Sequence, residues 1–209
     1  DDHMRLPAKV LVTAMQSHQR YFPLTRDDGS LYPAFLAISN GDPAHADIIT
    51  AGNECVLSAR LQDATFSFQK DLQLGLVELD RKLETIVFHQ ALGTLADKRD
   101  RLAAGVRALA AVTGEDSSAA ERAALLAKAD LGATLVSEFS ELQGYAGAHY
   151  ARLSGDPDDV AQAIEEHYLP EGPASPTPGT VAGALLAGAE KIDALVGAFA
   201  IDERPTSSK

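Results

Sequence analysis

Three short groups of polar residues in this sequence have side chains that could bind a ligand or carry chemistry. The first is His18-Gln19-Arg20-Tyr21-Phe22, where a histidine, an amide and a guanidinium lie beside two aromatic rings. Side chains of these types can stack on nucleobases and hold phosphate groups. They also suit an ordinary turn whose rings join the core and whose polar groups face water. The residue types alone leave both interpretations open.

The second group, Lys98, Arg99 and Arg101, is the only basic cluster in the sequence. A basic run on a helix is usually a solvated face, and the alternative is a contact with phosphate. The formal net charge of −12 opposes general binding to nucleic acid. Residues 102–209 hold 7 Lys or Arg against 16 Asp or Glu, so we expect any RNA contact mainly in the first half.

The third group is Glu138, Glu141 and Gln143, which alternate with apolar residues just before Gly144. The surrounding residues 125–151 have apolar side chains at helical spacing and predict two helices joined by a tight polar corner. We expect the three polar side chains to fix this corner or a contact between domains. The alternative is that the acids only cap a helix while the glycine relieves crowding.

The start of the chain is expected to be β-rich. β-Branched and apolar residues, together with turn residues, predict strands and turns over 5–40, with strands at 9–13 and 33–39 and a turn at 27–30. Because two strands alone are marginal in water, we expect strands outside this chain to complete the sheet. We therefore assign residues 1–51 to the edge of a preceding domain.

The rest of the chain, residues 52–209, is expected to form a helical domain, so the fold class is mainly α. A Pro/Gly/Ser linker is predicted at 171–179. Helical periodicity and end signals predict the remaining helices, which cover 52–68, 76–87, 95–109, the two halves of 125–151, 156–168 and 180–199.

No catalytic motif is present in the sequence. The six histidines are scattered, Cys55 has no neighbouring base, and no G-x-S-x-G, P-loop or G-x-G-x-x-G occurs. We therefore predict no catalytic residue. No apolar run is long enough to span a membrane, and a single cysteine suits a reducing compartment, so we expect a cytoplasmic protein.

The stretch KADLxxxLVxEFxELQGxxGxxYA, at residues 128–151, resembles a signature of the beta subunit of the bacterial heterotetrameric glycyl-tRNA synthetase. Since that subunit is several times longer than this chain, the resemblance implies an internal fragment. Six further blocks resemble the same family in the same order: MQSHQRYFPL (15–24), FLAISN (35–40), GNECVLSARLQDATFSF (52–68), VFHQALGTLADK (87–98), EEHYLP (165–170) and EKIDALVGAFAI (190–201).

The resemblance implies a part in the ATP-dependent joining of glycine to its tRNA. In this family the alpha subunit carries the reaction and binds ATP and Mg²⁺, while the beta subunit chiefly recognises and positions tRNA. The implied partners are therefore the alpha subunit and glycine tRNA, with no cofactor in this fragment, which we expect to be inactive alone. The residues we predict to contact RNA are His18, Gln19, Arg20, Arg60, Lys98, Arg99 and Arg101.

The resemblance also implies that the helical part is similar to an HD domain, whose active members bind metal through histidines and aspartates. Here His89, expected on an earlier helix, Lys128, Asp130 and Glu190 fall in the corresponding region. A lysine where a cation would sit predicts a lost metal centre, replaced by a Lys128–Glu190 or Lys128–Asp130 salt bridge. The alternatives are a metal-dependent HD-type nucleotide phosphohydrolase and a purely structural bridge.

Overall fold

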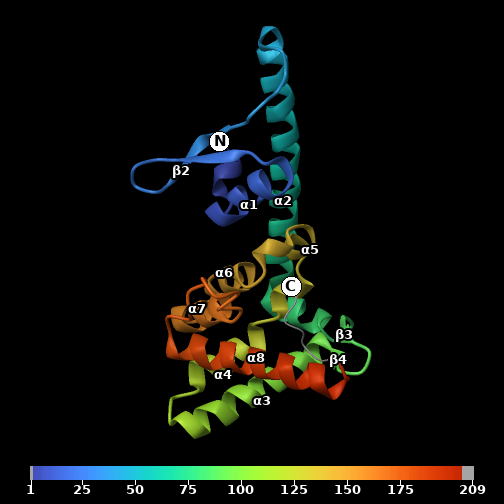
Figure 1. Ribbon diagram of the computed structural model, residues 1–209, viewed down its shortest axis with the longest axis vertical. Coiled ribbons are helices and arrows are strands. Elements are labelled where there is room, and N and C mark those ends of the chain that lie inside the picture. The colour runs from blue at the N-terminus through green and yellow to red at the C-terminus, as the bar shows by residue number, and fades with distance from the viewer. Residues whose placement is uncertain (1, 204–209) are drawn as a thin grey trace.

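The structure is a computed structural model that describes residues 2–203. It is elongated, with one long helix joining an N-terminal lobe to a larger helical lobe (Figure 1). The elements in chain order are η1 (Asp2–Arg5), α1 (Ala8–Gln19), β1 (Phe22–Thr25), β2 (Leu31–Leu36), η2 (Pro43–His45), α2 (Ala46–Lys82), β3 (Val87–His89), β4 (Gly93–Thr94), α3 (Leu95–Thr113), α4 (Ser118–Leu126), η3 (Ala129–Gly132), α5 (Thr134–Glu138), η4 (Ser140–Leu142), α6 (Tyr145–Leu153), α7 (Asp158–Glu166) and α8 (Val181–Ala200). The prediction of a mainly α chain with a small β part is confirmed.

The N-terminal lobe contains a helix where the sequence predicted a strand. Residues 9–13 lie in α1, so that prediction was wrong. The buried residues of this segment are Val10, Leu11, Ala14 and Met15, which follow helical spacing and form one apolar face. This packing outweighs the strand preference of the β-branched residues at 10, 12 and 13.

The predicted turn at 27–30 is confirmed and connects a β-hairpin. Strands β1 and β2 are antiparallel, with Phe22 opposite Leu36, and Gly29 supplies the positive φ of 81° that the turn requires. The second strand is β2 (Leu31–Leu36), which starts earlier than the predicted 33–39. One ring contact fixes the hairpin on the lobe, because Phe35 lies 4.7 Å from Tyr21 between ring centroids.

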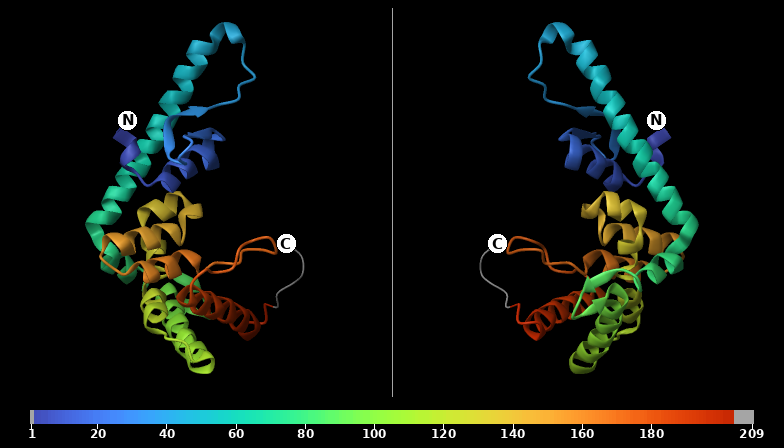
Figure 2. Two further views of the ribbon diagram at one scale, coloured as in Figure 1. Left: turned by 90° about the vertical axis from the view of Figure 1, so that its left-hand side faces the viewer. Right: turned by 90° about the vertical axis from the view of Figure 1, so that its right-hand side faces the viewer.

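Helix α2 runs along one side of the N-terminal lobe and ends at the upper part of the helical lobe (Figure 2). It spans 37 residues and begins at Ala46, earlier than the predicted start at 52. The sequence predicted two helices here, and the structure has one backbone break, at Gly75, with φ 76° and ψ 159°. This conformation is essentially restricted to glycine, so the break is encoded by that residue.

The helical lobe is built on the contact between α3 and α8. A glycine allows the two helices to approach closely, because a Cβ on Gly105 would lie 3.1 Å from the Cβ of Ala189. The β3–β4 hairpin, which was not predicted, precedes α3, and residues 171–179 contain no helix or strand, as predicted for the linker.

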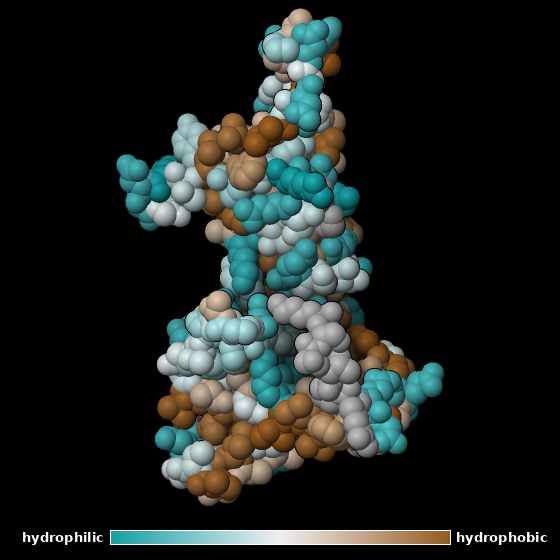
Figure 3. Space-filling model, viewed as in Figure 1, coloured by the Kyte–Doolittle hydropathy of each residue, from teal (hydrophilic) through white to brown (hydrophobic). Residues whose placement is uncertain are grey.

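Only part of the surface of helix α8 is buried. Its inner residues Leu185, Leu186 and Ala189 lie in the core. Apolar side chains also gather on the exposed face of the lower lobe (Figure 3). On α8 the exposed ones recur at helical spacing and are Ile192, Leu195, Val196 and Phe199.

Candidate nucleic-acid interface

Arg20 ends helix α1 in a conformation that favours glycine. Its φ of 55° and ψ of 32° are left-handed, and its backbone N–H donates to the Gln16 carbonyl at 3.2 Å. A side chain in this region costs about 1 kcal/mol relative to glycine. The guanidinium is exposed and has no hydrogen bond or ion pair with any residue that the structure describes. This arginine therefore combines a strained backbone with an exposed cation that no described residue pairs.

A hollow of about 590 Å³ lies beside Arg20. It is formed where the end of α1 and the start of β1 meet residues 37–40 and the first turns of α2. The Tyr21 hydroxyl donates to Asn53 Oδ1 at 2.9 Å and joins the α1–β1 connection to α2 in the lining of the hollow. Gln19 and Phe22 also line it, so the structure brings four consecutive residues of the predicted cluster to one place. The side chain of His18 lies outside the described part of the chain.

Arg60 is exposed on α2. It follows Asn53 by seven residues, which is two helical turns, so both side chains lie on the same side of the helix about 10.5 Å apart along its axis. No partner for its guanidinium is found among the residues described. Arg20 and Arg60 are thus two exposed cations of the N-terminal half for which the described residues supply no partner.

Lys98 lies in a different environment from these two exposed arginines. Its side chain is buried, with 4% of the residue exposed, and its Nζ lies 2.8 Å from Asp193 Oδ2 and 3.1 Å from Glu190 Oε1. Burial would raise the pKa of Asp193, but hydrogen bonds from Arg101 and Lys98 outweigh burial and lower that pKa. Lys98 therefore holds α3 against α8.

Arg99 and Arg101 are also paired inside the protein. Arg99 lies 2.6 Å from Asp80 on α2 and 2.8 Å from its neighbour Asp100. Arg101 Nε lies 2.6 Å from Asp193 Oδ1, and its Nη1 donates to the Leu92 carbonyl at 2.9 Å. The basic cluster at 98–101 thus joins α3 to its neighbours.

The polar corner is made of short helices rather than two long ones. Glu138 accepts a hydrogen bond from Ser67 Oγ at 2.8 Å, which joins α5 to α2. Gln143 accepts one from the Tyr168 hydroxyl at 3.4 Å, and Glu141 is exposed in η4.

Two buried aspartates that were not predicted for this role support the corner. Asp71 accepts the backbone N–H groups of Thr134 and Leu135, both at 2.8 Å, at the start of α5. Asp130 accepts those of Gly144 at 2.7 Å and Gly147 at 3.2 Å, at the start of α6. The sequence gives little indication of the contact between Asp71 and the start of α5, because 63 residues separate Asp71 from Thr134.

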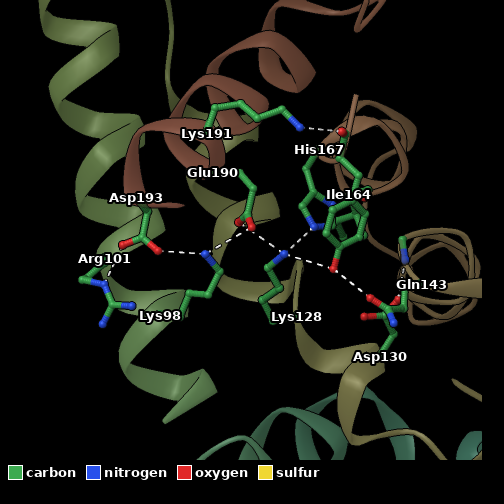
Figure 4. A network of polar contacts seen from close by, with 12 residues as sticks. Lys98, Arg101, Lys128, Asp130, Gln143, Ile164, His167, Glu190, Lys191 and Asp193 are labelled. Carbon is green, nitrogen blue, oxygen red and sulfur yellow. Dashed lines mark hydrogen bonds and ion pairs between the residues drawn. The ribbon is translucent and has the colours of Figure 1, made fainter. Parts of the chain in front are cut away.

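Lys128 lies at the centre of a buried polar network (Figure 4). Its Nζ lies 3.2 Å from Glu190 Oε2 and 2.8 Å from His167 Nε2, and it donates to the Tyr168 hydroxyl at 3.1 Å. Only 2% of Lys128 is exposed. Burial lowers the pKa of Lys128 to about 8, although the charge of Glu190 partly opposes this shift. The network joins the end of α4 to α7 and α8.

His167 was not predicted as part of this network. Burial and the charge of Lys128 lower the pKa of His167 well below its ordinary value. Its Nδ1 lies 2.6 Å from the Ile164 carbonyl, so the neutral ring carries its proton on Nδ1 and accepts from Lys128 at Nε2. The signal available in the sequence was only a His-Tyr pair near a helix end.

A family model described as glycyl-tRNA synthetase beta subunit matches residues 1–209, the whole chain. The chain belongs to the glycyl-tRNA synthetase beta subunit family.

Similar members of this family include proteins named glycine–tRNA ligase beta subunit from three bacteria. The Desulforamulus reducens protein is 47% identical over 212 residues, covering 100% of this chain and 30% of that protein. The Acaryochloris marina protein is 44% identical, and the match covers 99% of this chain and 30% of that protein. The Acinetobacter baumannii protein is 43% identical, with the same coverage. The chain thus spans about 30% of the length of these relatives.

Within this glycyl-tRNA synthetase beta subunit chain, the expected Lys128–Glu190 salt bridge is confirmed, whereas Asp130 binds backbone N–H groups instead. Burial raises the pKa of Asp130 to about 6, against the opposing effect of those N–H groups. His89 lies on strand β3, so its placement on a helix was wrong, and its Nε2 is 4.0 Å from Glu203.

Over residues 2–203, no group of three His, Cys, Asp or Glu side chains has the arrangement of a metal site. The ammonium groups of Lys98 and Lys128 both lie against Glu190, where they oppose a second cation. The residues present therefore do not fit a metal at this place. A search of the described helices for a membrane span found none with the required length and apolar character.

Proposed function

We propose that this chain is a non-catalytic, tRNA-contacting part of a glycine–tRNA ligase beta subunit. The observation that carries this proposal is the pair of exposed guanidinium groups at Arg20 and Arg60, neither of which has a partner among the residues that the structure describes. Family membership supplies the RNA as the expected partner, since the relatives are named glycine–tRNA ligase beta subunits. Binding of tRNA phosphates would give these two cations a charge partner, which neither has among the described residues.

The surroundings of the two arginines support this choice. Phosphate recognition favours arginine, because its planar guanidinium donates several hydrogen bonds in a fixed geometry. The cations of the 98–101 cluster already have carboxylate partners, so contact with RNA would require breaking ion pairs that hold α3. Gln19 lies next to Arg20 at the same hollow and supplies a neutral hydrogen-bonding group.

The test is binding of glycine tRNA to the 209-residue chain and to the variants Arg20→Gly and Arg60→Gln. We expect each variant to bind more weakly and to reduce the slope of log affinity against log salt, by about 0.7 to 0.9 for each phosphate group that the variant no longer neutralises. The matched control is Arg107→Gln, because Arg107 is an exposed arginine paired with Glu121 in the other lobe. The control should keep the affinity and slope of the unchanged chain.

Arg20→Gly is a useful variant because glycine suits the backbone conformation at this position. A loss of binding in a fully folded variant can then be assigned to the missing side chain. Unchanged tRNA binding in both arginine variants would contradict the proposal and support a structural bridge between domains.

The remaining parts of the proposal concern the whole enzyme. In the whole enzyme, this chain would act together with an alpha subunit that binds ATP and Mg²⁺. We propose that this enzyme works in the cytoplasm. Consistent with a non-catalytic role, the buried groups around Lys128 are paired with one another. We also propose that the helical lobe is similar to an HD domain. The alternative of a metal-dependent nucleotide phosphohydrolase has no support among the residues described.

A further inference from the structure

We propose that the hollow beside Arg20 receives one unpaired nucleobase of the bound RNA, stacked on the ring of Phe22. This inference rests on the proposed function, and it adds a ligand class and a binding site to it. It predicts that the N-terminal lobe distinguishes single-stranded RNA from a bare sugar-phosphate chain. Arg20 alone, as a phosphate contact, would not make that distinction.

The size and lining of the hollow suit a base. Its volume of about 590 Å³ lies within the usual range for small-molecule sites, roughly 300 to 1,000 Å³. Its lining contains the single charge of Arg20, and the remaining side chains are amides, a serine, two aromatic rings and aliphatic groups. The absence of a carboxylate from this lining is notable in a chain with a net charge of −12, because it removes the repulsion that an RNA would meet elsewhere.

Phe22 provides a stacking surface. Phe22 is 50% exposed, whereas its chain neighbour Tyr21 is buried. Across the hairpin Phe22 is paired with Leu36. A half-exposed phenylalanine next to a hollow leaves apolar ring surface in water, and a stacked base would cover it. The paired strands hold the backbone of Phe22, so little ordering of the site is required on binding.

The amides around the hollow can hydrogen-bond to the edge of a base. The Oδ1 of Asn53 accepts from the Tyr21 hydroxyl, which directs the amide so that both N–H groups of Nδ2 are available as donors. Gln19 and Asn40 also line the hollow, and neither side chain has a hydrogen bond to another described residue. Amides offer both donors and acceptors, which are the groups exposed on an unpaired base.

Arg20 completes the site from the rim of the hollow. Its guanidinium has no partner among the described residues and suits a phosphate oxygen of the same nucleotide or a neighbouring one. A base inside an A-form duplex is stacked and paired, so it could not enter the hollow without being extruded. The ligand is therefore an unpaired stretch of RNA, such as a loop or an end.

The experiment compares two probes on the 209-residue chain: a short single-stranded RNA of mixed sequence, and a ribose-phosphate oligomer of equal length without bases. Phe22→Leu removes the ring and keeps an apolar side chain. We expect the unchanged chain to bind the RNA more tightly than the base-free oligomer, and Phe22→Leu to weaken RNA binding about fivefold or more. The same variant should bind the base-free oligomer normally.

The matched control is Phe66→Leu, because Phe66 is an exposed phenylalanine on α2 that does not line the hollow. It should leave both affinities unchanged. Asn53→Leu, with folding verified by its melting temperature, gives a second measure and should also weaken only RNA binding.

The outcomes separate this inference from the proposed function. If both probes bind equally and Phe22→Leu changes neither affinity, while Arg20→Gly still weakens tRNA binding, the base site is overturned and the RNA-contact proposal stands. If neither probe nor tRNA binds, both are overturned. Equal losses for Phe22→Leu and Phe66→Leu would also contradict a base site, because they would show a general effect of exposed aromatic surface.

Discussion

Two sets of basic side chains have opposite environments in this chain. Lys98 and Lys128 are buried, share Glu190 as a partner and connect the helices of the C-terminal lobe. Arg20 and Arg60 are exposed and have no partner among the residues described. The same type of charge thus stabilises one lobe and remains available to a ligand on the other.

The difference arises from distant parts of the sequence. The partners of Lys98 lie on α8, and Asp193 is 95 residues away from it. A buried ammonium without such partners would be strongly unfavourable, whereas an exposed guanidinium is solvated by water. The sequence near each cation does not reveal which of the two environments applies.

The largest expected effect is on the buried set. Lys128→Met removes the ammonium and leaves the Glu190 carboxylate with Lys98 alone. We expect the free energy of unfolding to fall by about 3 to 5 kcal/mol, because a buried charge loses one of its partners. Arg60→Gln should change it by no more than about 0.5 kcal/mol. Urea unfolding followed by circular dichroism measures both values.

A second variant determines whether the charge pair causes that loss. Adding Glu190→Gln to Lys128→Met removes the partly unpaired carboxylate and should recover part of the lost stability. If Lys128→Met and Arg60→Gln prove equally mild, the distinction between the two sets of cations is wrong.

The next largest effect is a pH dependence of stability that arises from Lys128. Burial lowers the pKa of Lys128 from its ordinary 10.5 to about 8. Between these values the unfolded chain keeps a proton on this amine that the folded chain has lost, so the free energy of unfolding rises with pH across this window. Lys128→Met lacks this rise, so the gap in stability between the unchanged chain and the variant should widen above pH 8.

The measurement is urea unfolding of both proteins at several pH values on either side of that pKa. Arg60→Gln serves as the control and should follow the unchanged chain at every pH. A gap between the unchanged chain and Lys128→Met that narrows as pH rises would contradict the assigned shift.

The smallest effect concerns the exposed set. Arg20→Gly should raise the free energy of unfolding by up to about 1 kcal/mol, because glycine removes the cost of a side chain in the left-handed region. The increase is limited by the greater entropy of glycine in the unfolded chain. Thermal unfolding of the variant beside Arg60→Gly checks this result, because Arg60 lies on helix α2, is not among the positive-φ residues and has no partner among the described residues. A clear loss of stability in Arg20→Gly would mean that its side chain has a structural role.

Much of the helical part could be predicted from the sequence. The helices later identified as α3, α7 and α8 follow from apolar spacing and from their end signals, and the linker at 171–179 follows from its Pro and Gly content. The first strand was mispredicted because β-branched residues at 10, 12 and 13 dominated a local view. The decisive signal was the burial of one helical face at Val10, Leu11, Ala14 and Met15, which depends on packing against α2.

The candidate site could be predicted only in part. The cluster at 18–22 was recognised by residue type, and the Lys128–Glu190 salt bridge by comparing positions with a resembled family. His167 was missed, because its place beside Lys128 depends on how α7 packs against the end of α4. Asn40 and Asn53 were missed for the same reason, since only the fold brings them to the hollow at Arg20.

The most direct test of the central claim is selective chemical modification of arginines in the unchanged chain, with and without glycine tRNA, read by mass spectrometry. We expect Arg20 and Arg60 to react fast and to be protected by tRNA. Arg99 and Arg101 should react more slowly, with the same rate in both samples, since their guanidinium groups are held by carboxylates. Protection of Arg99 and Arg101 by tRNA, with Arg20 and Arg60 unaffected, would contradict the account.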